Sequence, residues 1–354
     1  MKKLVIIQTV APDYRELFFK RIKEVLVDDF ELYAGNISFE TTIQTKSEIH
    51  KKLNNYFLFN RKLLFQTGIW HLLFKNYILV LEMNPRNISN WIFLVTRKIL
   101  NKKTVLWGHA WPRSGKKSKS DFIRNFMRIL ASKIIVYTNN QKKELELKMP
   151  TKEILAAPNA VYKTTNMKTV VHKEQVNLIY VGRLVKSKKV FFMVKSFHSA
   201  ISILPKEAKL FIVGDGEEKD RLIKYIKKNK LTNRIVVFGH IGDYERLQNL
   251  YNNSVFSISP GYVGLSITQS FSFGVPMLVS KDENHSPEIE AVRENSNALF
   301  FATDDESDFT RVLSEIYRNI VFWKNQRDKI ISFCKKEYST EVMAQVFIDL
   351  IKNE

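Results

Sequence analysis

Short, almost uninterrupted runs of apolar residues recur along the chain, with segments of helical length between them. In the first half, these runs predict buried strands at Leu4–Gln8, Tyr77–Leu81, Thr104–Trp107, Lys133–Tyr137 and Ile154–Ala156. In the second half, they predict strands at Val176–Val181, Lys209–Val213, Arg234–Phe238, Val255–Ser259 and Met277–Val279. Continuous apolar strands are typical of sheets covered on both faces, and their alternation with helices indicates parallel sheets. The pattern predicts an α/β protein of two doubly wound, Rossmann-like domains.

A polar, unpatterned stretch between the two series of strands indicates the domain boundary. We expect domains at residues 1–168 and 169–339 of the 354-residue chain, which is longer than a single hydrophobic core usually grows. Ser339 or Thr340 as N-cap, with an apolar stripe that includes Met343 and Phe347, predicts a helix at 340–354. We expect this helix to pack back on the first domain.

No apolar run approaches the roughly 18–20 residues that a membrane span needs. The start of the chain lacks the long apolar core and cleavage site of a signal peptide. The only cysteine is Cys334, so intrachain disulfides and a cysteine-based zinc site are excluded. We expect a soluble or peripheral protein in a reducing compartment, with Cys334 as a small buried residue.

Most of the excess positive charge lies in the first half of the chain. The net charge is +20, and residues 1–170 hold 30 basic and 13 acidic side chains. Residues 51–130 hold 16 basic and two acidic side chains, interleaved with apolar stretches such as Tyr56–Phe59 and Leu72–Phe74. A basic, aromatic-rich surface suits the headgroup region of an anionic membrane. Solvated charged faces and a polyanion or nucleic acid are the alternatives, although no nucleic-acid-binding module is recognisable.

Strand ends in the second half carry residues that suit a phosphate ligand, and ligands of open α/β sheets bind beyond the carboxyl ends of strands. Gly182 and Arg183 follow the first strand of this half, and Lys188 comes five residues after Arg183. A guanidinium and an ammonium group at this position could both contact a diphosphate, although ordinary surface charges would read the same way. The next two strand ends carry residues that fit a tight turn or the wall of a base pocket: Gly214, Gly216 and His240.

The fourth strand end is the most specific of the four. Pro260–Gly264 leads from the strand into a predicted helix at Leu265–Phe273. Glycines ahead of a helix let backbone N–H groups approach an anion, and the helix N-terminus adds partial positive charge. A plain junction between loop and helix would also explain the glycines.

In this order and spacing, these elements resemble the C-terminal domain of group 1 glycosyltransferases, family 4 of the retaining enzymes with the GT-B fold. The resemblance covers about residues 177–302 and rests on Tyr180–Leu184 with Lys188, Phe211–Gly216, Val237–His240, Ser259–Leu265 and Ser272–Pro276. It implies two domains that face each other across a cleft, with Arg183 and Lys188 on the donor diphosphate and no metal. The donor-binding residues that it implies are Gly182, Gly214, Gly216, His240, Gly261, Tyr262, Val263, Gly264, Leu265 and Gln269.

The sequence departs from the family at the two positions where relatives often carry glutamates. Gly261 and Gln269 stand there, and Lys189 replaces the glycine that usually follows the lysine. Gln269 can still form hydrogen bonds to a ribose, whereas Gly261 offers only its backbone. We interpret the chain as a variant subgroup that lacks the usual glutamate pair.

The resemblance is looser in the first half. His109 follows a predicted strand where the family often has a His-Gly pair that meets the donor sugar, so we expect His109 to contact the sugar or share a proton. A structural histidine bonded to backbone is the alternative. Other strand ends supply an expected acceptor side: Tyr14, Arg15, Glu82 and Arg113. An ion pair of Glu82 with Arg86 or Arg113, and a surface position for Arg15, are the alternatives there.

The sequence thus predicts a metal-independent hexosyltransferase or related glycosyltransferase. We expect it to move a sugar from a nucleotide-diphosphate donor, UDP rather than GDP, to a lipid-linked or saccharide acceptor in cell-surface polysaccharide (capsule, lipopolysaccharide or exopolysaccharide) synthesis. Retention of configuration is implied by the resemblance alone. We expect a cytoplasmic protein peripheral at the inner face of the cell membrane, with an anionic membrane surface as a partner, no nucleic acid and no bound cofactor. The alternatives are a catalytically silent nucleotide-sugar-binding or scaffold protein of the same fold, a basic protein that binds nucleic acid, and an epimerase.

Overall fold

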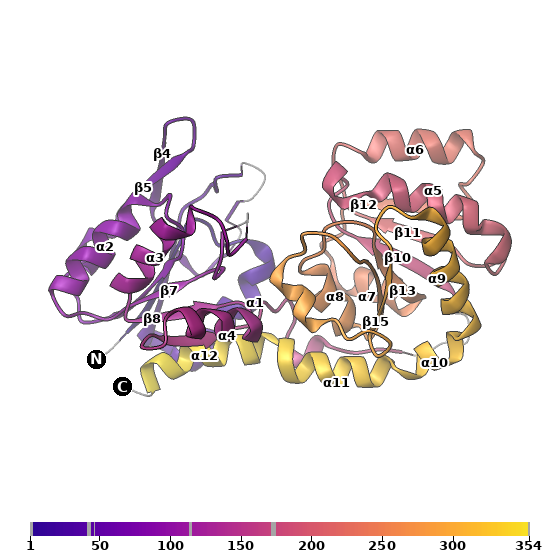
Figure 1. The fold of residues 1–354 in the computed structure, drawn as a ribbon. Coiled ribbons are helices and arrows are strands. Elements are labelled where there is room, and N and C mark those ends of the chain that lie inside the picture. Colours follow the sequence, from indigo (N-terminus) through magenta and orange to yellow (C-terminus); the bar gives the residue numbers. More distant parts are fainter. Residues whose placement is uncertain (1–2, 41–43, 46, 113–114, 171–174, 353–354) are drawn as a thin grey trace. The chain divides into compact units, whose positions relative to one another are not determined.

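The computed structural model describes residues 3–40, 44–45, 47–112, 115–170 and 175–352 (Figure 1). The chain divides into two compact units. Unit 1 contains Met1–Val161 and Tyr338–Glu354, and unit 2 contains Tyr162–Glu337. These divisions lie near the ones expected at 168–169 and 339–340.

Unit 1 is built on a seven-stranded sheet of order β3-β2-β1-β6-β7-β8-β9, in which all neighbours are parallel. Its strands are β1 (Leu4–Gln8), β2 (Phe30–Ala34), β3 (His50–Lys52), β6 (Ile78–Glu82), β7 (Thr104–Trp107), β8 (Lys133–Val136) and β9 (Glu153–Ala156). A separate antiparallel hairpin pairs β4 (Asn54–Leu58) with β5 (Leu63–Thr67). The helices are α1 (Glu16–Leu26), α2 (Ile88–Ile99), α3 (Asp121–Leu130), α4 (Asn139–Lys148) and α12 (Thr340–Lys352). Apolar cores lie on both faces of the sheet, as its continuous apolar strands require.

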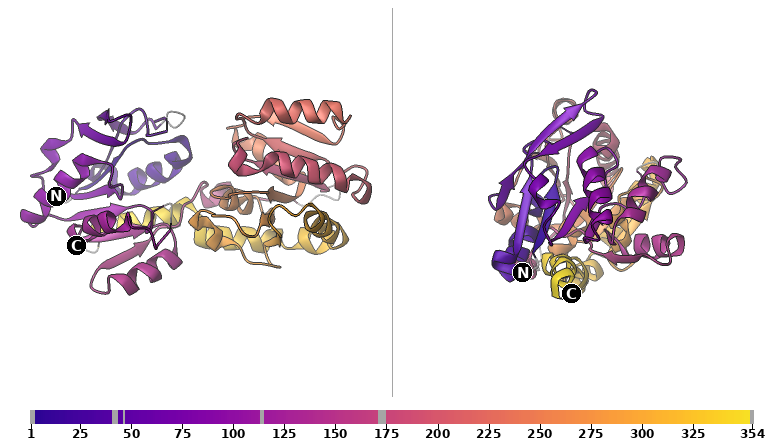
Figure 2. Two further views of the ribbon diagram at one scale, coloured as in Figure 1. Left: turned by 45° about the horizontal axis from the view of Figure 1, so that its top comes forward. Right: turned by 90° about the vertical axis from the view of Figure 1, so that its left-hand side faces the viewer.

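Unit 2 repeats this architecture with a six-stranded parallel sheet of order β12-β11-β10-β13-β14-β15. Its strands are β10 (Asn177–Val181), β11 (Leu210–Val213), β12 (Ile235–Gly239), β13 (Ser254–Ser259), β14 (Met277–Ser280) and β15 (Ala298–Phe301). The helices are α5 (Val190–Ala200), α6 (Lys219–Lys228), α7 (Tyr244–Asn252), α8 (Ser266–Ser272), α9 (Glu306–Arg318), α10 (Ile320–Asn325) and α11 (Arg327–Tyr338), whose last residue belongs to unit 1. Figure 2 shows the helices of each unit on both sides of its sheet.

The strand prediction is confirmed in both units. Each of the ten expected strands is present, with its ends within one residue of the expected ones. The sequence pattern did not reveal β2, β3, β15 or the β4–β5 hairpin. The prediction of two doubly wound domains with parallel sheets is therefore correct, but each sheet has more strands than predicted.

The terminal helix also forms as expected. The Val342 N–H donates to the Ser339 hydroxyl at 3.3 Å, so Ser339 acts as the N-cap of α12. α12 packs against α1 inside unit 1. The Phe347 ring lies in T-shaped contact with Phe18 and Trp107, with ring centres 5.0 and 4.9 Å apart. Cys334 is fully buried, which confirms its expected role as a small core residue.

The aromatic-rich stretch at residues 56–74 is only partly a surface. Tyr56, Phe59 and Phe74 are exposed, whereas Leu64 is buried and Ile69, Leu72 and Leu73 lie in a core of unit 1. The interpretation of this region as a membrane surface stays a prediction, which the aromatic side chains that are exposed could meet and the buried aliphatic ones could not. Within the part of the chain that the structure describes, no helix has the length and apolar character needed to cross a membrane.

Candidate active site

The expected phosphate-binding residues of unit 2 lie at one edge of its sheet. β12, β11, β10 and β13 are neighbours in the sheet and all run in the same direction. His240, Gly214, Gly182 and Pro260 each follow the carboxyl end of one of these strands. The fold therefore brings together residues from four segments that are far apart in the sequence, at the edge where α/β sheets bind ligands.

Two glycines allow the loops after β10 and β11 to touch. A Cβ atom on Gly214 would collide with the carbonyl oxygen of Gly182, and one on Gly216 would lie 2.5 Å from that of Leu184. The two loops are also joined by a hydrogen bond of 2.8 Å from the Leu184 N–H to the Asp215 carbonyl. Gly214 and Gly216 thus act through close backbone approach. His240 lies exposed at the end of β12.

Lys188 is the central cation of this edge. It ends a 3₁₀ turn, Lys186–Lys188, and its Nζ donates to the Tyr262 carbonyl at 2.6 Å while lying 4.3 Å from the centre of the Tyr262 ring. Desolvation and the charge of Arg183 lower the pKa of Lys188 to about 8, and the carboxylate of Glu288 acts in the opposite direction. Arg183 itself is exposed. The arrangement brings two positive charges close together, which an anion would stabilise.

The next residue, Lys189, lies in the left-handed region with φ of 49°. Glycine adopts this conformation without steric cost, which accounts for the glycine expected at this position in the family. Lys189 holds its place through ion pairs of 2.6 Å to both Glu283 and Asp304. The substitution is thus accommodated by two carboxylates that anchor the lysine.

Position 261 requires glycine because the Lys186–Lys188 turn lies close to it. A Cβ atom on Gly261 would lie 2.7 Å from the Ser187 carbonyl oxygen and 3.0 Å from the Lys188 carbonyl carbon. The Tyr262 N–H donates to the same Ser187 oxygen at 3.3 Å, so the turn and the loop are tied together. A glutamate could not occupy position 261 without moving the backbone that carries Lys188.

The loop from Gly261 to Gly264 is held from behind by residues that follow β14. His285 accepts at Nδ1 from the Val263 N–H at 3.2 Å, so its Nε2 carries the proton and donates to the Ser280 carbonyl at 2.8 Å. Burial lowers the pKa of His285, which favours this neutral form. The Ser286 N–H donates to the Val263 carbonyl at 2.9 Å, and the Ser286 and Tyr262 hydroxyls form a further hydrogen bond.

Glu288 is a carboxylate at this edge that the sequence reasoning missed. It lies on a 3₁₀ turn, Pro287–Ala291, directly after Ser286, and is only 5% exposed. Its negative charge raises the pKa of Lys188. The available signal was an acidic residue behind a proline shortly after a predicted strand, but nothing in the local pattern connected it with Lys188.

The helix after the loop, α8, has seven residues and lies within the expected range Leu265–Phe273. Gly264 and Leu265 precede it, as expected. Gln269 is half-buried on this helix, and its Nε2 donates to the Tyr162 hydroxyl at 3.2 Å. The side chain therefore has a protein partner inside unit 2 in addition to any ligand.

In unit 1, the expected acceptor-side residues Arg15 and Glu82 are embedded in a polar network. Glu82 accepts from the backbone N–H and the hydroxyl of Thr9 at 2.8 and 2.5 Å, and desolvation raises its pKa above the usual value. Arg15 donates to the Tyr137 hydroxyl at 2.9 Å and lies 4.4 Å from the centre of the Trp107 ring. Arg15 is therefore half-buried and not an ordinary surface residue.

The expected alternative partner of Glu82 is engaged elsewhere. Arg86 donates to the carbonyl oxygens of Arg61 and Lys62 and lies 3.9 Å from the centre of the Phe39 ring. The alternative of a Glu82–Arg86 ion pair is thus wrong, because Thr9 holds the carboxylate. Arg113 lies outside the described residues. Tyr14 is exposed beside Arg15.

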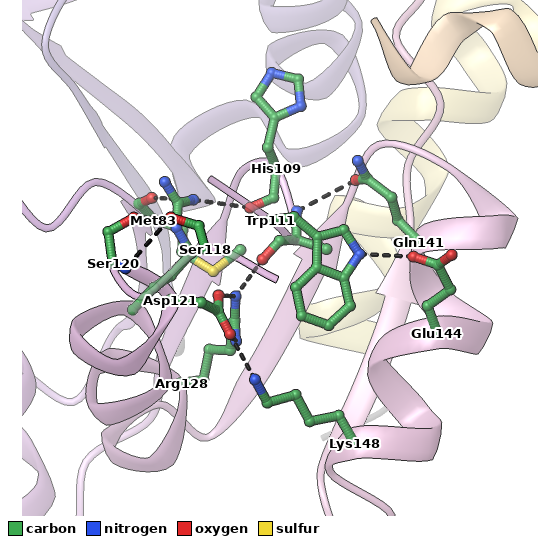
Figure 3. Close-up of polar contacts among 12 residues, drawn as sticks. Met83, His109, Trp111, Ser118, Ser120, Asp121, Arg128, Gln141, Glu144 and Lys148 are labelled. Carbon is green, nitrogen blue, oxygen red and sulfur yellow. Dashed lines mark hydrogen bonds and ion pairs between the residues drawn. The ribbon is translucent and has the colours of Figure 1, made fainter. Parts of the chain in front are cut away.

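His109 lies after β7 on the surface of unit 1. Its ring packs on Tyr137 at 4.7 Å, and its backbone carbonyl accepts from Arg124 at 2.9 Å. Figure 3 shows the imidazole pointing away from the polar contacts that hold its backbone. Desolvation, followed by the charges of Arg124 and Arg15, lowers the pKa of His109 below 6.5. A neutral imidazole is therefore available to accept a proton or a hydrogen bond.

A buried network fixes the loop that carries His109 (Figure 3). Arg128 and Asp121 form an ion pair of 2.6 Å with almost no exposure, and Lys148 adds a contact of 2.5 Å to the same carboxylate. Arg128 also donates to the Ala110 carbonyl. Trp111 donates to Glu144 at 2.7 Å. These contacts hold the loop against α3 and α4, so that His109 has a defined backbone position.

Among the residues that the structure describes, no group of three or more His, Cys, Asp or Glu side chains is arranged to hold a metal ion.

Comparison with known proteins identifies relatives for both the sequence and the fold. Residues 163–337 match the family model of glycosyl transferases group 1. An uncharacterized glycosyltransferase of Methanocaldococcus jannaschii is 27% identical over 232 residues, which cover 58% of this chain and 55% of that protein. The chain spans about half the length of the curated relatives that it matches.

Two solved structures share the whole fold. Anabaena HepE in complex with UDP aligns with a TM-score of 0.70 and 13% identity, and all of both chains is covered. The lipopolysaccharide outer core galactosyltransferase WaaB, in its apo form, aligns with a TM-score of 0.67 and 14% identity, again over all of both chains. Because the sequence identities are low, this structural likeness establishes the fold of this chain alone, which is the GT-B fold.

Proposed function

Since the family match and the fold both support a group 1 glycosyltransferase of the GT-B type, we propose that this chain transfers a sugar from a UDP-sugar to a hydroxyl group of a saccharide or lipid-linked acceptor. The observation that carries the proposal is the pairing of Lys188 and Arg183 at the ligand-binding edge of unit 2. Desolvation, and after it the charge of Arg183, lowers the pKa of Lys188 to about 8, so an added anion such as a diphosphate would stabilise the charged form of this lysine.

The same groups fit the chemistry of transfer. The bond between the anomeric carbon and the diphosphate oxygen breaks, a bond to the acceptor oxygen forms, and the acceptor hydroxyl loses its proton. Negative charge grows on the leaving diphosphate, so fixed positive groups beside it lower the barrier. We assign this role to Lys188 and Arg183. Because these cations neutralise the leaving group, the reaction proceeds without a divalent metal.

The surrounding residues divide the remaining work of the donor site. The Gly261–Gly264 loop borders the phosphates and positions Lys188 beside them, because its own Tyr262 and Val263 N–H groups donate to Ser187 and His285. Gly182, Gly214 and Gly216 keep the loops close enough for the donor to approach the backbone. His240 borders the base, and Gln269 forms a hydrogen bond to the ribose. Glu288 replaces the carboxylate that position 261 cannot hold and contacts the donor sugar.

Unit 1 supplies the acceptor side. Arg15, held over Trp107, binds an anionic group of the acceptor, and Tyr14 beside it contributes a ring for sugar stacking. His109 accepts a hydrogen bond from a sugar hydroxyl, because its lowered pKa keeps the imidazole neutral near pH 7. Glu82 fixes Thr9 and so shapes the end of β1.

We place the reaction in family 4, with retention of configuration, and in the synthesis of cell-surface polysaccharide. WaaB, a lipopolysaccharide galactosyltransferase, shares the fold, and hexosyl transfer suits the same site. The excess of basic residues in unit 1 supports a cytoplasmic protein at the inner face of the membrane, where anionic lipid is its partner. A catalytically silent nucleotide-sugar-binding protein is the second candidate, because Gly261 and Gln269 replace both usual glutamates.

One experiment separates these two functions. The purified chain is incubated with a panel of UDP- and GDP-sugars and a saccharide acceptor mixture, with and without EDTA, and released nucleotide is measured. Acceptor-dependent release of UDP that EDTA does not reduce supports the proposed enzyme. Tight UDP-sugar binding without acceptor-dependent release by any donor would favour the silent protein instead.

A further inference from the structure

Helix α3 turns its charged residues inward and its apolar residues outward, the reverse of an ordinary surface helix. Asp121 and Arg128 are buried, and Arg124 reaches inward to the carbonyl oxygens of Met83 and His109. The outward face carries large apolar side chains that are 49–68% exposed: Phe122, Ile123, Phe126 and Ile129. Phe122 and Phe126 pack edge to face at 4.8 Å, so the outer face already forms a small apolar cluster.

Helix α2 packs against α3 (Figure 1) and also buries an arginine, in its case beside the core residues Phe93 and Leu94. Arg97 on α2 is completely buried and donates to five backbone carbonyl oxygens and to Thr104. The outward stripe of α2 and of the residue after it is apolar and 38–78% exposed: Ile92, Val95, Ile99 and Leu100. Two neighbouring helices thus use arginines for the interior and expose aliphatic and aromatic groups. We call these eight exposed side chains the α2–α3 face.

Lysines flank this face at both ends. Lys117 and Lys119 are exposed directly before α3, and Lys98 is exposed in the last turn of α2. Lys152 donates to the Ala131 carbonyl at 2.6 Å, at the end of α3, and burial together with the charge of Lys98 lowers the pKa of Lys152. Lys98 in the last turn of α2 and Lys152, which contacts the end of α3, therefore lie near one another. Residues 88–130 contain a single acidic residue, Asp121, and that carboxylate is already paired.

We propose that the α2–α3 face is the surface by which this protein binds an anionic lipid bilayer. The exposed rings and aliphatic groups enter the boundary between headgroups and acyl chains, and the lysines at both ends bind lipid phosphates. This inference deepens the proposed function by assigning its membrane partner to named residues. The test of this membrane surface needs no transfer activity, so the membrane proposal and the proposed enzymatic function can fail separately.

The charge pattern favours a bilayer over a second copy of this chain as the occupant. Two copies of this face would bring their lysines together, and the described residues of the face offer no acidic group to offset them. An apolar centre with cations at its margins is complementary to a sheet of anionic headgroups over acyl chains. The eight apolar residues also lie on, or directly after, two helices that pack against each other, so they are not single apolar residues scattered over the surface.

The proposal is tested by sedimentation of the full chain with vesicles of phosphatidylcholine alone or with about one third phosphatidylglycerol. We expect binding to the anionic vesicles that is much weaker on phosphatidylcholine and weaker in high salt. The double variant Phe122→Ser/Phe126→Ser should lower the partition coefficient about tenfold or more, because the two rings that would enter the bilayer are lost. Its UDP affinity should not change, since neither ring belongs to the donor site.

The matched control is Leu147→Ser, which removes an apolar side chain that is 87% exposed on α4 of the same unit. This variant should bind vesicles as the wild type does. If the double variant does not fold, Ile99→Ser on α2, where the side chain is 78% exposed, replaces it. Equal vesicle binding by the α2–α3 variants and the wild type would overturn the proposal. The proposal would also be overturned if the wild type did not bind vesicles and formed a dimer that these substitutions dissociate. A second copy would then cover the face.

Discussion

The substitution Gly261→Ala tests how closely the Lys186–Lys188 turn approaches the donor loop. The added Cβ atom would lie 2.7 Å from the Ser187 oxygen and 3.0 Å from the Lys188 carbonyl carbon, whereas ordinary contacts begin at 3.4 Å. Both neighbours are backbone atoms, so no flexible side chain can move aside. The turn is in addition tied down by the Lys188 N–H, which donates to the Val185 carbonyl at 2.9 Å.

Overpacking of this kind costs about 1–3 kcal/mol. For a unit of this size, each kcal/mol lowers the midpoint of thermal unfolding by about 2–4 °C. We therefore expect a fall of about 2–12 °C in the transition that UDP stabilises. Displacement of Lys188 should also weaken UDP binding about tenfold or more, the range expected when one charge-assisted hydrogen bond is lost. Gly261→Glu, which introduces the residue common in the family, should lower stability and UDP binding further and should not raise transfer activity.

The assay combines thermal unfolding with and without UDP and a calorimetric titration of UDP. The matched control is Gly242→Ala in the same unit, where a Cβ atom would meet its nearest neighbour, His240 Nε2, at an ordinary 3.6 Å. This control should keep the wild-type midpoint and affinity. A Gly261→Ala protein with the midpoint and UDP affinity of the wild type would refute the account of position 261.

Four further substitutions, one of them a control, and one pH titration test other parts of the account. The pKa of Lys188 is lowered to about 8, so the free protein loses this proton above pH 8. UDP affinity should therefore fall by up to tenfold per pH unit in that range. Calorimetric titrations of UDP at a series of pH values should show a flatter fall for Lys188→Arg, since arginine keeps its proton. Glu288→Gln removes a charge that raises this pKa, so the fall should begin at lower pH, whereas Glu290→Gln should leave its onset unchanged. Arg97→Met leaves buried carbonyl oxygens without a donor and should lower the free energy of unfolding by about 3 kcal/mol or more in urea denaturation; a loss under 1 kcal/mol would contradict the assigned role.

The sequence was sufficient for the interior of both sheets but not for their edges. β1, β7 and β10 are continuous apolar runs because helices cover both of their faces. β3 reads His50-Lys51-Lys52 and lies at the end of its sheet, where one side needs no apolar residue. The β4–β5 hairpin turns through three residues with positive φ, Phe59 to Arg61, none of which is a glycine. Such a turn leaves no recognisable signal in the sequence.

The candidate site shows the same division between local and tertiary information. Arg183 and Lys188 follow a strand end, which the sequence pattern reveals directly. The requirement for glycine at position 261 comes from tertiary structure. The turn that packs against this position lies more than 70 residues away in the sequence. Glu288 joins the site through β14 and its following loop, so only the folded structure connects it with Lys188.

The arginines buried on α2 and α3 explain why composition located the proposed membrane surface only roughly. Basic and aromatic residues are mixed throughout residues 51–130, but burial separates them in an unexpected direction. Arg97 and Arg128 lie in the interior, where they donate to backbone carbonyls and Asp121, while Phe122 and Ile99 face outward. A pattern that places arginines outside and apolar residues inside would assign the opposite face.

The most direct test of the central claim, that Lys188 and its neighbours bind the diphosphate of the donor, is a calorimetric titration of UDP into the full chain near neutral pH. The account predicts one site on the wild type, at least tenfold weaker binding by Lys188→Gln, and wild-type binding by Lys186→Gln, whose side chain is exposed two residues earlier. A folded wild-type protein that does not bind UDP, or a Lys188→Gln variant that binds it as tightly as the wild type, would contradict the claim.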